Sequence, residues 1–181
     1  MNSKQDQMTS TDVTTLRWVV MGVCGCGKSE IGQGLAHRLH VQFIEGDQYH
    51  PSSNVLKMRD GTPLTDSDRS DWLMQLTKLI ADAREQGHGL VLSCSALKRA
   101  YRDLLRSADL DLRFIHLHGD RHLIAERMQA RQQHFMPVSL LDSQLADLQV
   151  LQDDEVGISL DIEETPDTLI NHIIKMHTTS L

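Results

Sequence analysis

The sequence has too few cysteines for a secreted disulfide scaffold, and its apolar runs are too short for a membrane protein. Its 181 residues include three cysteines, an odd number, and Cys24 and Cys26 are only one residue apart, which does not suit a disulfide framework. No stretch approaches the ~18 continuous apolar residues of a membrane span, and residues 1–15 lack the apolar centre of a signal peptide. We therefore expect a protein of the reducing cytoplasm, with no membrane partner and a disordered tail over residues 1–15.

Positive charge is also scarce. Eighteen Lys and Arg stand against twenty-five Asp and Glu, for a net charge of −7. This balance argues against a nucleic-acid partner, which is bound by neutralising phosphates. An anionic small molecule would need a local group of basic side chains. The chain is long enough to bury one core without disulfides, so we expect one domain over residues 16–181.

Short apolar runs alternate with helical patterns from Arg17 onward, which is typical of parallel strands connected by helices. The expected strands are Trp18 to Met21, Gln42 to Ile44, Leu90 to Ser93, Arg113 to Leu117 and Ile158 to Ile162. Their apolar content without strict alternation suits a sheet covered on both faces. The pattern predicts an α/β fold with a parallel sheet of about five strands.

The clearest helical pattern runs from Asp66 to about Glu85, with Thr65 and Asp68 as a capping pair and Gly87 after its end. Further helices are expected after Asp120 and after Thr165. Two stretches lack such a pattern. We expect an acceptor-binding insertion from Asp47 to about residue 65 and a lid over residues 132–137, because loops on an α/β scaffold usually carry function.

An eight-residue motif follows the first expected strand directly. It consists of Gly22, Val23, Cys24, Gly25, Cys26, Gly27, Lys28 and Ser29, with the pattern GxxxxGKS. Its glycines let backbone N–H groups turn inward around phosphates, and the next helix adds the positive end of its dipole. We expect Lys28 to reach the outer phosphates and Ser29 to bind Mg²⁺. The motif predicts a phosphate-binding loop (P-loop) for a nucleotide.

Cys24 and Cys26 occupy variable positions of this loop, where small side chains suffice. A zinc site is the alternative, but zinc normally takes four ligands and the chain has no second cysteine pair. Lys28 and a helix N-terminus nearby are conditions that lower a cysteine pKa. We therefore expect both cysteines to fill the loop and to be reactive as thiolates.

A P-loop occurs in GTPases, transporters, helicases and small kinases. The sequence has no Asn-Lys-x-Asp motif for guanine and no Leu-Ser-Gly-Gly-Gln signature, and it is too short for a helicase core. The insertion after the second strand and the arginines before the expected lid favour a kinase that closes over a small acceptor. A regulatory protein that uses the P-loop as a switch is the alternative, although a switch needs neither a lid arginine such as Arg131 nor an acceptor-orienting carboxylate such as Asp47.

Several further blocks share an order with a known family. They are the P-loop, Glu45-Gly46-Asp47, Tyr49-His50-Pro51, Lys57-Met58, Asp68-Arg69, Trp72-Leu73, Cys94 to Lys98, Tyr101-Arg102-Asp103, Arg127, Arg131, His134 to Pro137 and Ser143-Gln144. This series closely resembles gluconokinases of the small P-loop type. The resemblance implies ATP- and Mg²⁺-dependent phosphorylation of D-gluconate at its 6-hydroxyl, a fold similar to shikimate and adenylate kinases, and a possible homodimer. A shikimate-type kinase is the neighbouring alternative.

Two carboxylates follow the second expected strand. Asp47 lies just beyond the strand's carboxyl end, where ligands of open α/β sheets bind, so it is the candidate to orient or deprotonate the acceptor hydroxyl. Its alternative role is to stabilise the turn before Pro51. Glu45 lies two residues earlier on the same strand face and is the candidate to hold Mg²⁺ through water, with Ser29. Related families usually have Asp in place of Glu45.

The remaining candidates are basic. Arg127 and Arg131 are four residues apart on one helix face, and the resemblance implies that Arg127 packs on adenine and that Arg131 touches the transferring phosphate. A solvated helix face is the alternative. The resemblance places three further cations near the acceptor, namely Arg69, Lys98 and Arg102. His50 and Lys98 are candidates for further polar contacts to the acceptor. Arg69 is the candidate to clamp the acceptor carboxylate with its planar fork. The alternative role of His50 is to fix its own loop before Pro51.

The resemblance weakens after Ser143. Relatives tend to have Leu-Glu-x-Pro where this chain has Leu148-Gln149-Val150-Leu151. We therefore assign no nucleotide contact to this segment. Trp72 and Met58 are expected in the core rather than in a pocket.

Overall fold

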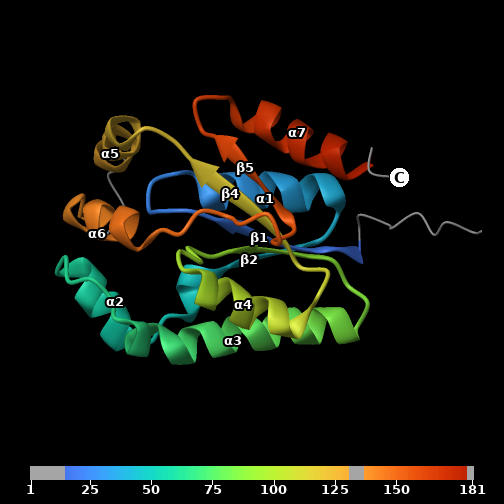
Figure 1. Ribbon diagram of the computed structural model, residues 1–181, viewed down its shortest axis with the longest axis horizontal. Coiled ribbons are helices and arrows are strands. Elements are labelled where there is room, and N and C mark those ends of the chain that lie inside the picture. The colour runs from blue at the N-terminus through green and yellow to red at the C-terminus, as the bar shows by residue number, and fades with distance from the viewer. Residues whose placement is uncertain (1–14, 131–136, 179–181) are drawn as a thin grey trace, which may run out of the picture.

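Five parallel strands form the centre of the computed structural model, which describes residues 15–130 and 137–178 (Figure 1). They are β1 (Arg17–Met21), β2 (Gln42–Glu45), β3 (Leu90–Ser93), β4 (Arg113–His118) and β5 (Gly157–Asp161), in the spatial order β2-β3-β1-β4-β5. All four neighbouring pairs are parallel. The α/β fold and the five-stranded sheet are confirmed, and each strand lies within one residue of its expected bounds.

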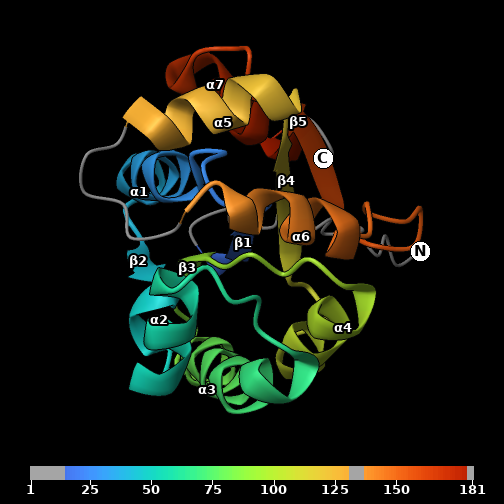
Figure 2. The ribbon, with the colours of Figure 1, turned by 90° about the vertical axis from the view of Figure 1, so that its left-hand side faces the viewer.

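Helices cover both faces of the sheet. They are α1 (Lys28–Leu39), α2 (Ser52–Arg59), α3 (Asp66–Glu85), α4 (Arg99–Ala108), α5 (Arg121–Ala130), α6 (Ser139–Asp147) and α7 (Pro166–Thr178), with a 3₁₀ turn, η2, over Gly46–Tyr49. The side chains of β1 alternate between two cores, with Val20 packed beneath α1 and α7 and Val19 packed against α3 and α4. Figure 2 shows these two helix layers on opposite sides of the sheet.

Helix α3 has the bounds that the sequence predicts. Thr65 Oγ1 accepts from the Asp68 backbone N–H at 3.2 Å, and the Asp68 carboxylate accepts from the Thr65 N–H at 2.9 Å, so the capping box is complete. After the helix, Gly87 adopts φ +67°, a left-handed conformation that ends a helix without strain.

The insertion after β2 is more regular than expected. Residues 47–65 were expected to form an insertion because they lack a helical pattern, but η2 and α2 occupy most of them. Pro51 precedes α2 and Pro63 follows it, so neither proline removes an N–H that the helix needs. The two prolines bracket a helix instead of preventing one.

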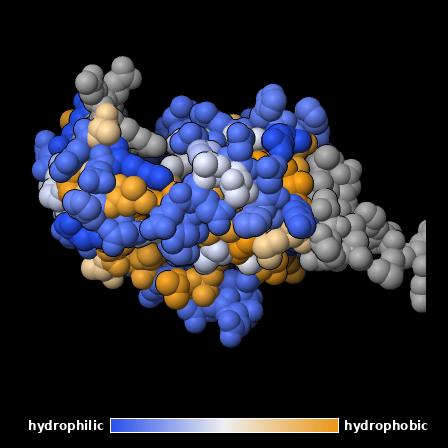
Figure 3. All heavy atoms as spheres, turned by 90° about the horizontal axis from the view of Figure 1, so that it is seen from above, coloured by the Kyte–Doolittle hydropathy of each residue, from blue (hydrophilic) through white to orange (hydrophobic). Residues whose placement is uncertain are grey.

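The predicted tail lies outside the described residues apart from Thr15, and the predicted lid lies outside them apart from Pro137. No described helix is long and apolar enough to cross a membrane. The face seen over α5 and α7 is covered mainly by hydrophilic residues, with smaller apolar patches between them (Figure 3).

Candidate active site

A cleft opens where β1, β2 and β3 end. Its lining comes from five parts of the chain: Cys24, Gly25, Gly27, Lys28 and Ser29 of the P-loop; Asp47, His50 and Met58 of the insertion; Pro63, Leu64 and Arg69 around the start of α3; Ser95 after β3; and Leu140, Ser143 and Gln144 of α6. These strand ends lie at the left of Figure 1, beside α2 and α6. The cleft thus brings the P-loop together with the insertion, as the sequence predicts.

The P-loop has backbone conformations that favour glycine. Gly22 has φ +139°, and a Cβ there would lie 2.5 Å from the Leu117 carbonyl oxygen, which leaves no space for a side chain. Gly27 has φ +91° at the N-cap of α1. Because α1 begins at Lys28, its free N–H groups and positive dipole end face the loop. This local geometry is suited to an anion.

Lys28 lies across the P-loop. Its Nζ donates to the Val23 carbonyl oxygen at 2.9 Å. Burial alone would lower its pKa, but Cys26, Asp47, Cys24 and Glu45 together hold the pKa of Lys28 above its usual value. The side chain is therefore a fixed cation at the cleft.

The two carboxylates at the end of β2 have different surroundings. Asp47 belongs to η2 and lines the cleft. Glu45 is the last residue of β2, and its Oε1 accepts from Ser93 Oγ at the end of β3 at 2.7 Å. Both carboxylates act on Lys28 electrostatically. Asp47 thus faces the cleft, and Glu45 is held beside the neighbouring strand.

His50 is fixed in its loop and also lines the cleft. Its ring stacks on Trp72 with centroids 4.1 Å apart and planes at 18°. Trp72 is fully buried, as expected, and its Nε1 donates to the Gly46 carbonyl oxygen at 2.8 Å. Burial and, secondarily, Arg69 lower the pKa of His50 to about 4. The ring is therefore neutral at pH 7.

Arg69 reaches the cleft from α3 with only 6% of its surface exposed. Its Nη1 donates to Tyr101 Oη at 3.1 Å and to Asp147 Oδ2 at 3.4 Å. Within the described part of the chain, these are its hydrogen bonds. The described residues thus leave the edge formed by Nε and Nη2 available for a planar anion.

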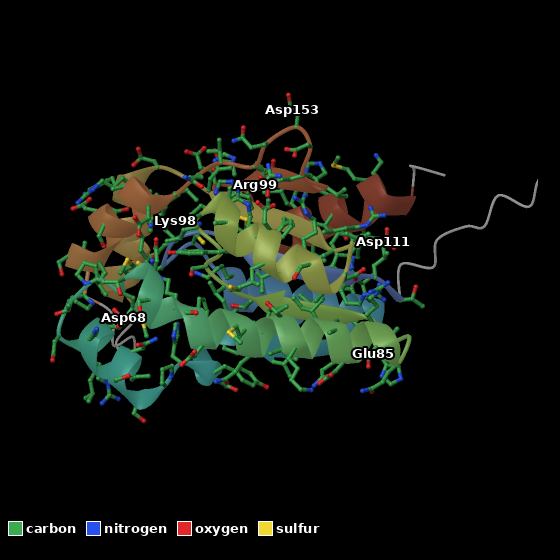
Figure 4. All side chains as sticks on the ribbon, turned by 60° about the horizontal axis from the view of Figure 1, so that its bottom comes forward. Asp68, Glu85, Lys98, Arg99, Asp111 and Asp153 are labelled. Carbon is green, nitrogen blue, oxygen red and sulfur yellow. The ribbon has the colours of Figure 1, made fainter. Side chains whose placement is uncertain are left out.

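Lys98 is not among the described residues that line the cleft, but it lies close to Asp147, the ion-pair partner of Arg69. Its Nζ donates to Asp66 Oδ1 at 2.8 Å and lies 3.7 Å from Asp147 Oδ1. Figure 4 shows Lys98 at the start of α4, at the same end of the molecule as Asp68, whereas Glu85 and Asp111 lie at the other end. Its contacts keep the carboxylates around Arg69 paired.

The expectation that Arg102 contacts the acceptor is wrong. Its side chain is fully buried, and Nε and Nη2 donate to the two oxygens of Glu155 at 2.6 and 2.8 Å. Nη1 donates to the carbonyl oxygens of Ala96, Leu97 and Gln149. All three guanidinium nitrogens are thus engaged within the protein, which a family resemblance cannot reveal.

A second cleft lies on the other side of the P-loop. It is lined by Cys26, Gly27, Glu30, Ile31, Arg127, Ala130, Ile162, Glu164, Pro166 and Leu169. Arg127 is held there by its Nη2, which donates to the Ile162 carbonyl oxygen at 2.8 Å. Arg131, the expected partner of Arg127, lies outside the described residues.

Both loop cysteines are buried, and Cys24 is not a reactive thiolate. Cys24 and Cys26 are 4% and 1% exposed, and Cys26 Sγ donates to the Val23 carbonyl oxygen at 2.9 Å. Burial outweighs the effect of Lys28 and raises the pKa of Cys24 to about 11. The expectation of a thiolate at Cys24 is therefore wrong. Among the described residues, no group of three or more His, Cys, Asp or Glu is placed to hold a metal.

Two residues of α6 that contact the site received no role in the sequence analysis. Gln144 Oε1 accepts from the Cys24 backbone N–H at 2.7 Å, and Asp147 pairs with Arg69. They are three residues apart and so share a helix face. The available signal was the Ser143-Gln144 block, which carried no assigned role.

Comparisons with known proteins identify the family of this chain. A family model described as shikimate kinase matches residues 24–175. A gluconokinase of Gluconobacter oxydans is 48% identical over 157 residues, which cover 87% of this chain and 88% of the relative. The crystal structure of a gluconokinase from Sinorhizobium meliloti 1021 superposes with a TM-score of 0.83 and 39% identity, covering 92% of this chain and 93% of that one. The chain belongs to the gluconokinase family.

The structures of more distant kinases are evidence for the fold of this member of the gluconokinase family, and for the fold alone. Shikimate kinase from Aquifex aeolicus superposes with a TM-score of 0.55 at 15% identity, over 89% of this chain and 95% of that one. The α/β P-loop kinase fold is therefore confirmed, and the acceptor must be argued from the site.

The segment that departs from the gluconokinase pattern is firmly held. The Gln149 N–H donates to the Leu97 carbonyl oxygen at 2.8 Å, and Gln149 Oε1 accepts from the Arg99 N–H at 2.6 Å. Arg102 also binds the carbonyl oxygens of Gln149 and Val150. Backbone contacts thus fix residues 148–151 without the glutamate and proline usual in relatives.

Proposed function

We propose that this protein transfers the terminal phosphoryl group of ATP to the 6-hydroxyl of D-gluconate. The observation that carries the proposal is one cleft, in a gluconokinase-family chain, that holds a P-loop, a carboxylate and an open arginine fork. Kinase catalysis consists largely of positioning reactants and compensating charge, and these groups serve both purposes.

The nucleotide side of the cleft fits Mg·ATP. Backbone N–H groups of the P-loop would hold the phosphates, Lys28 would pair with the outer ones, and Arg127 would pack on the base in the second cleft. Mg²⁺ normally combines one or two protein ligands with phosphate oxygens and waters. The Ser29 hydroxyl would serve as a direct ligand and Glu45 as a partner through water. When bound, the ion would neutralise charge on the phosphates.

The acceptor side fits a sugar acid. The edge of Arg69 that the described residues leave open would bind the gluconate carboxylate in two parallel hydrogen bonds. Asp47 would accept the hydrogen bond of the 6-hydroxyl and take its proton. His50, neutral at pH 7, would offer a donor or an acceptor to the sugar hydroxyls. Lys98 would act indirectly, by pairing with Asp66 and Asp147.

A panel of acceptors tests this function. We expect ADP release with Mg·ATP to be faster with D-gluconate than with shikimate, glucose or AMP. Shikimate is the informative competitor, because it also carries a carboxylate and its kinases share the fold. Equal or faster turnover with any of the other three would overturn the proposal. Nucleotide binding without transfer to any acceptor would favour a regulatory P-loop protein.

Location and assembly belong to the same proposal. Cys24, Cys26 and Cys94 are all free and buried, which is compatible with the cytoplasm. Family resemblance also implies a homodimer, which light scattering coupled to size-exclusion chromatography would test.

A further inference from the structure

Gln144 connects α6 to the P-loop by one short contact. Its Oε1 accepts from the Cys24 backbone N–H at 2.7 Å, across 120 residues of sequence. The side chain is half-buried and lines the same cleft as Lys28, Asp47 and Arg69. Figure 2 shows α6 lying across the end of the molecule where the strands finish.

This contact determines which way the Gln144 amide group is turned. A backbone N–H can only donate, so the oxygen of Gln144 must face Cys24. The Nε2 group, on the same planar amide, then points elsewhere with two N–H donors. Within the described part of the chain, those donors have no hydrogen-bond partner. A neutral donor is thus held in the cleft directly beside the P-loop.

We propose that Gln144 is a further catalytic residue, whose Nε2 donates to the phosphoryl group during its transfer. The inference rests on the proposed kinase function. In the step, the bond between the γ-phosphorus and the bridging oxygen of ATP breaks, a bond from gluconate O6 to that phosphorus forms, the O6 proton passes to Asp47, and ADP leaves. Gln144 is unchanged, and its donor stabilises charge on the phosphoryl oxygens.

A purely structural role makes a different prediction. If Gln144 only fastens α6 to the P-loop, Gln144→Glu should be tolerated, because a carboxylate oxygen still accepts from the Cys24 N–H. Gln144→Ala should then be the damaging change, and it should lower the melting temperature. If Gln144 donates to the phosphoryl group, Gln144→Glu removes the donor and places a negative charge beside an anion, so it should be the more damaging change for turnover.

Gln149 supplies a matched control. Gln149 Oε1 accepts from a backbone N–H, that of Arg99 at the start of α4, at 2.6 Å, which is the same kind of contact as that of Gln144. Gln149 is not among the described residues that line the cleft. We expect Gln149→Glu to change kcat by less than about twofold. Gln144→Glu should lower kcat by ~10² to 10³, the usual loss for one such donor, with ADP affinity within about threefold of wild type, because ADP lacks the transferred group.

The experiment measures kcat with gluconate, ADP affinity, melting temperature and acceptor-independent ATP hydrolysis for wild type, Gln144→Glu, Gln144→Ala and Gln149→Glu. The inference predicts that Gln144→Glu slows both reactions at an unchanged melting temperature. A kcat and a hydrolysis rate within threefold of wild type would overturn it. A wild type that hydrolyses ATP but does not phosphorylate gluconate would overturn the proposed acceptor instead, and the hydrolysis rates would still test Gln144.

Discussion

At the residue scale, Asp47 and Glu45 differ in what surrounds them. Asp47 lines the cleft, whereas Glu45 is bound by Ser93. Asp47→Asn keeps the size and removes the charge, so kcat should fall by the ~10² to 10⁴ typical of a lost general base, at near-normal ATP affinity. Glu45→Gln should instead raise the Mg²⁺ concentration needed for half-maximal rate. Titrations of both variants with gluconate and with magnesium measure these two effects. A raised Mg²⁺ requirement in Asp47→Asn but not in Glu45→Gln would mean that the two roles are reversed.

Arg69 offers a second prediction, on acceptor affinity. Arg69→Lys keeps the charge but loses the planar fork, so the KM for gluconate should rise about tenfold or more, in line with a hydrogen bond between charged groups. Arg84→Lys is the matched control, because Arg84 lies on the same helix, is exposed and, among the residues that the structure describes, donates only to the Ala108 carbonyl oxygen. A KM within twofold of wild type for Arg69→Lys would show that the carboxylate binds elsewhere.

Burial of Cys24 predicts slow thiol chemistry. A pKa of about 11, against an ordinary value of 9.0, leaves a thiolate fraction at pH 7.5 that is ~10²-fold smaller than in an exposed cysteine. Iodoacetamide should therefore label Cys24 far more slowly in the native protein than in urea, as followed by mass spectrometry of the loop peptide. Equal labelling rates would contradict the buried, protonated thiol.

At the element scale, Arg102 joins α4 to the segment that precedes β5. Removing one partner of a buried ion pair leaves an uncompensated charge, so Arg102→Ala should lower the free energy of unfolding by about 3–5 kcal/mol in urea titrations. Arg106→Ala, which removes an exposed pair with Asp103, should cost no more than about 1 kcal/mol. Similar losses in both variants would contradict this structural role.

Acid should weaken the same connection. Burial opposes ionisation of Glu155, but hydrogen bonds from Arg102 and the Gln152 N–H prevail and lower its pKa below the usual 4.5. A lowered folded-state pKa adds stability that is present above the unfolded value and is lost as the pH falls through the folded one. Glu155→Gln should therefore be less stable than wild type at pH 7, and the difference should shrink below about pH 4. A constant difference across this range would contradict the linkage.

The elements differ in how well the sequence predicted them. Strands and α3 follow from local patterns, because apolar runs, helical spacing and the Thr65 cap act within a few residues. Helix α2 in the insertion was not predicted, because this stretch shows no helical spacing of apolar residues; Pro51 and Pro63 lie outside its two ends. Arg102 was misassigned and Gln144 was overlooked for one reason: their partners are 53 and 120 residues away, and only the folded chain shows which polar groups meet.

At the scale of the whole molecule, the sheet brings five parts of the chain together around the cleft at one end. The central claim is that this end transfers a phosphoryl group from ATP to carbon 6 of gluconate. Lys28 carries the fixed positive charge of the P-loop, so Lys28→Ala should remain folded and lose ~10² to 10³ in rate, or roughly 3–4 kcal/mol.

The most direct measurement is product analysis of the purified protein with Mg·ATP and ¹³C-labelled D-gluconate, by ³¹P and ¹³C NMR. We predict one phosphate monoester on carbon 6, formed together with an equal amount of ADP, and a rate at least ~10²-fold lower in Lys28→Ala. Phosphate on another carbon, no sugar phosphate at all, or equal rates in the two proteins would contradict the account.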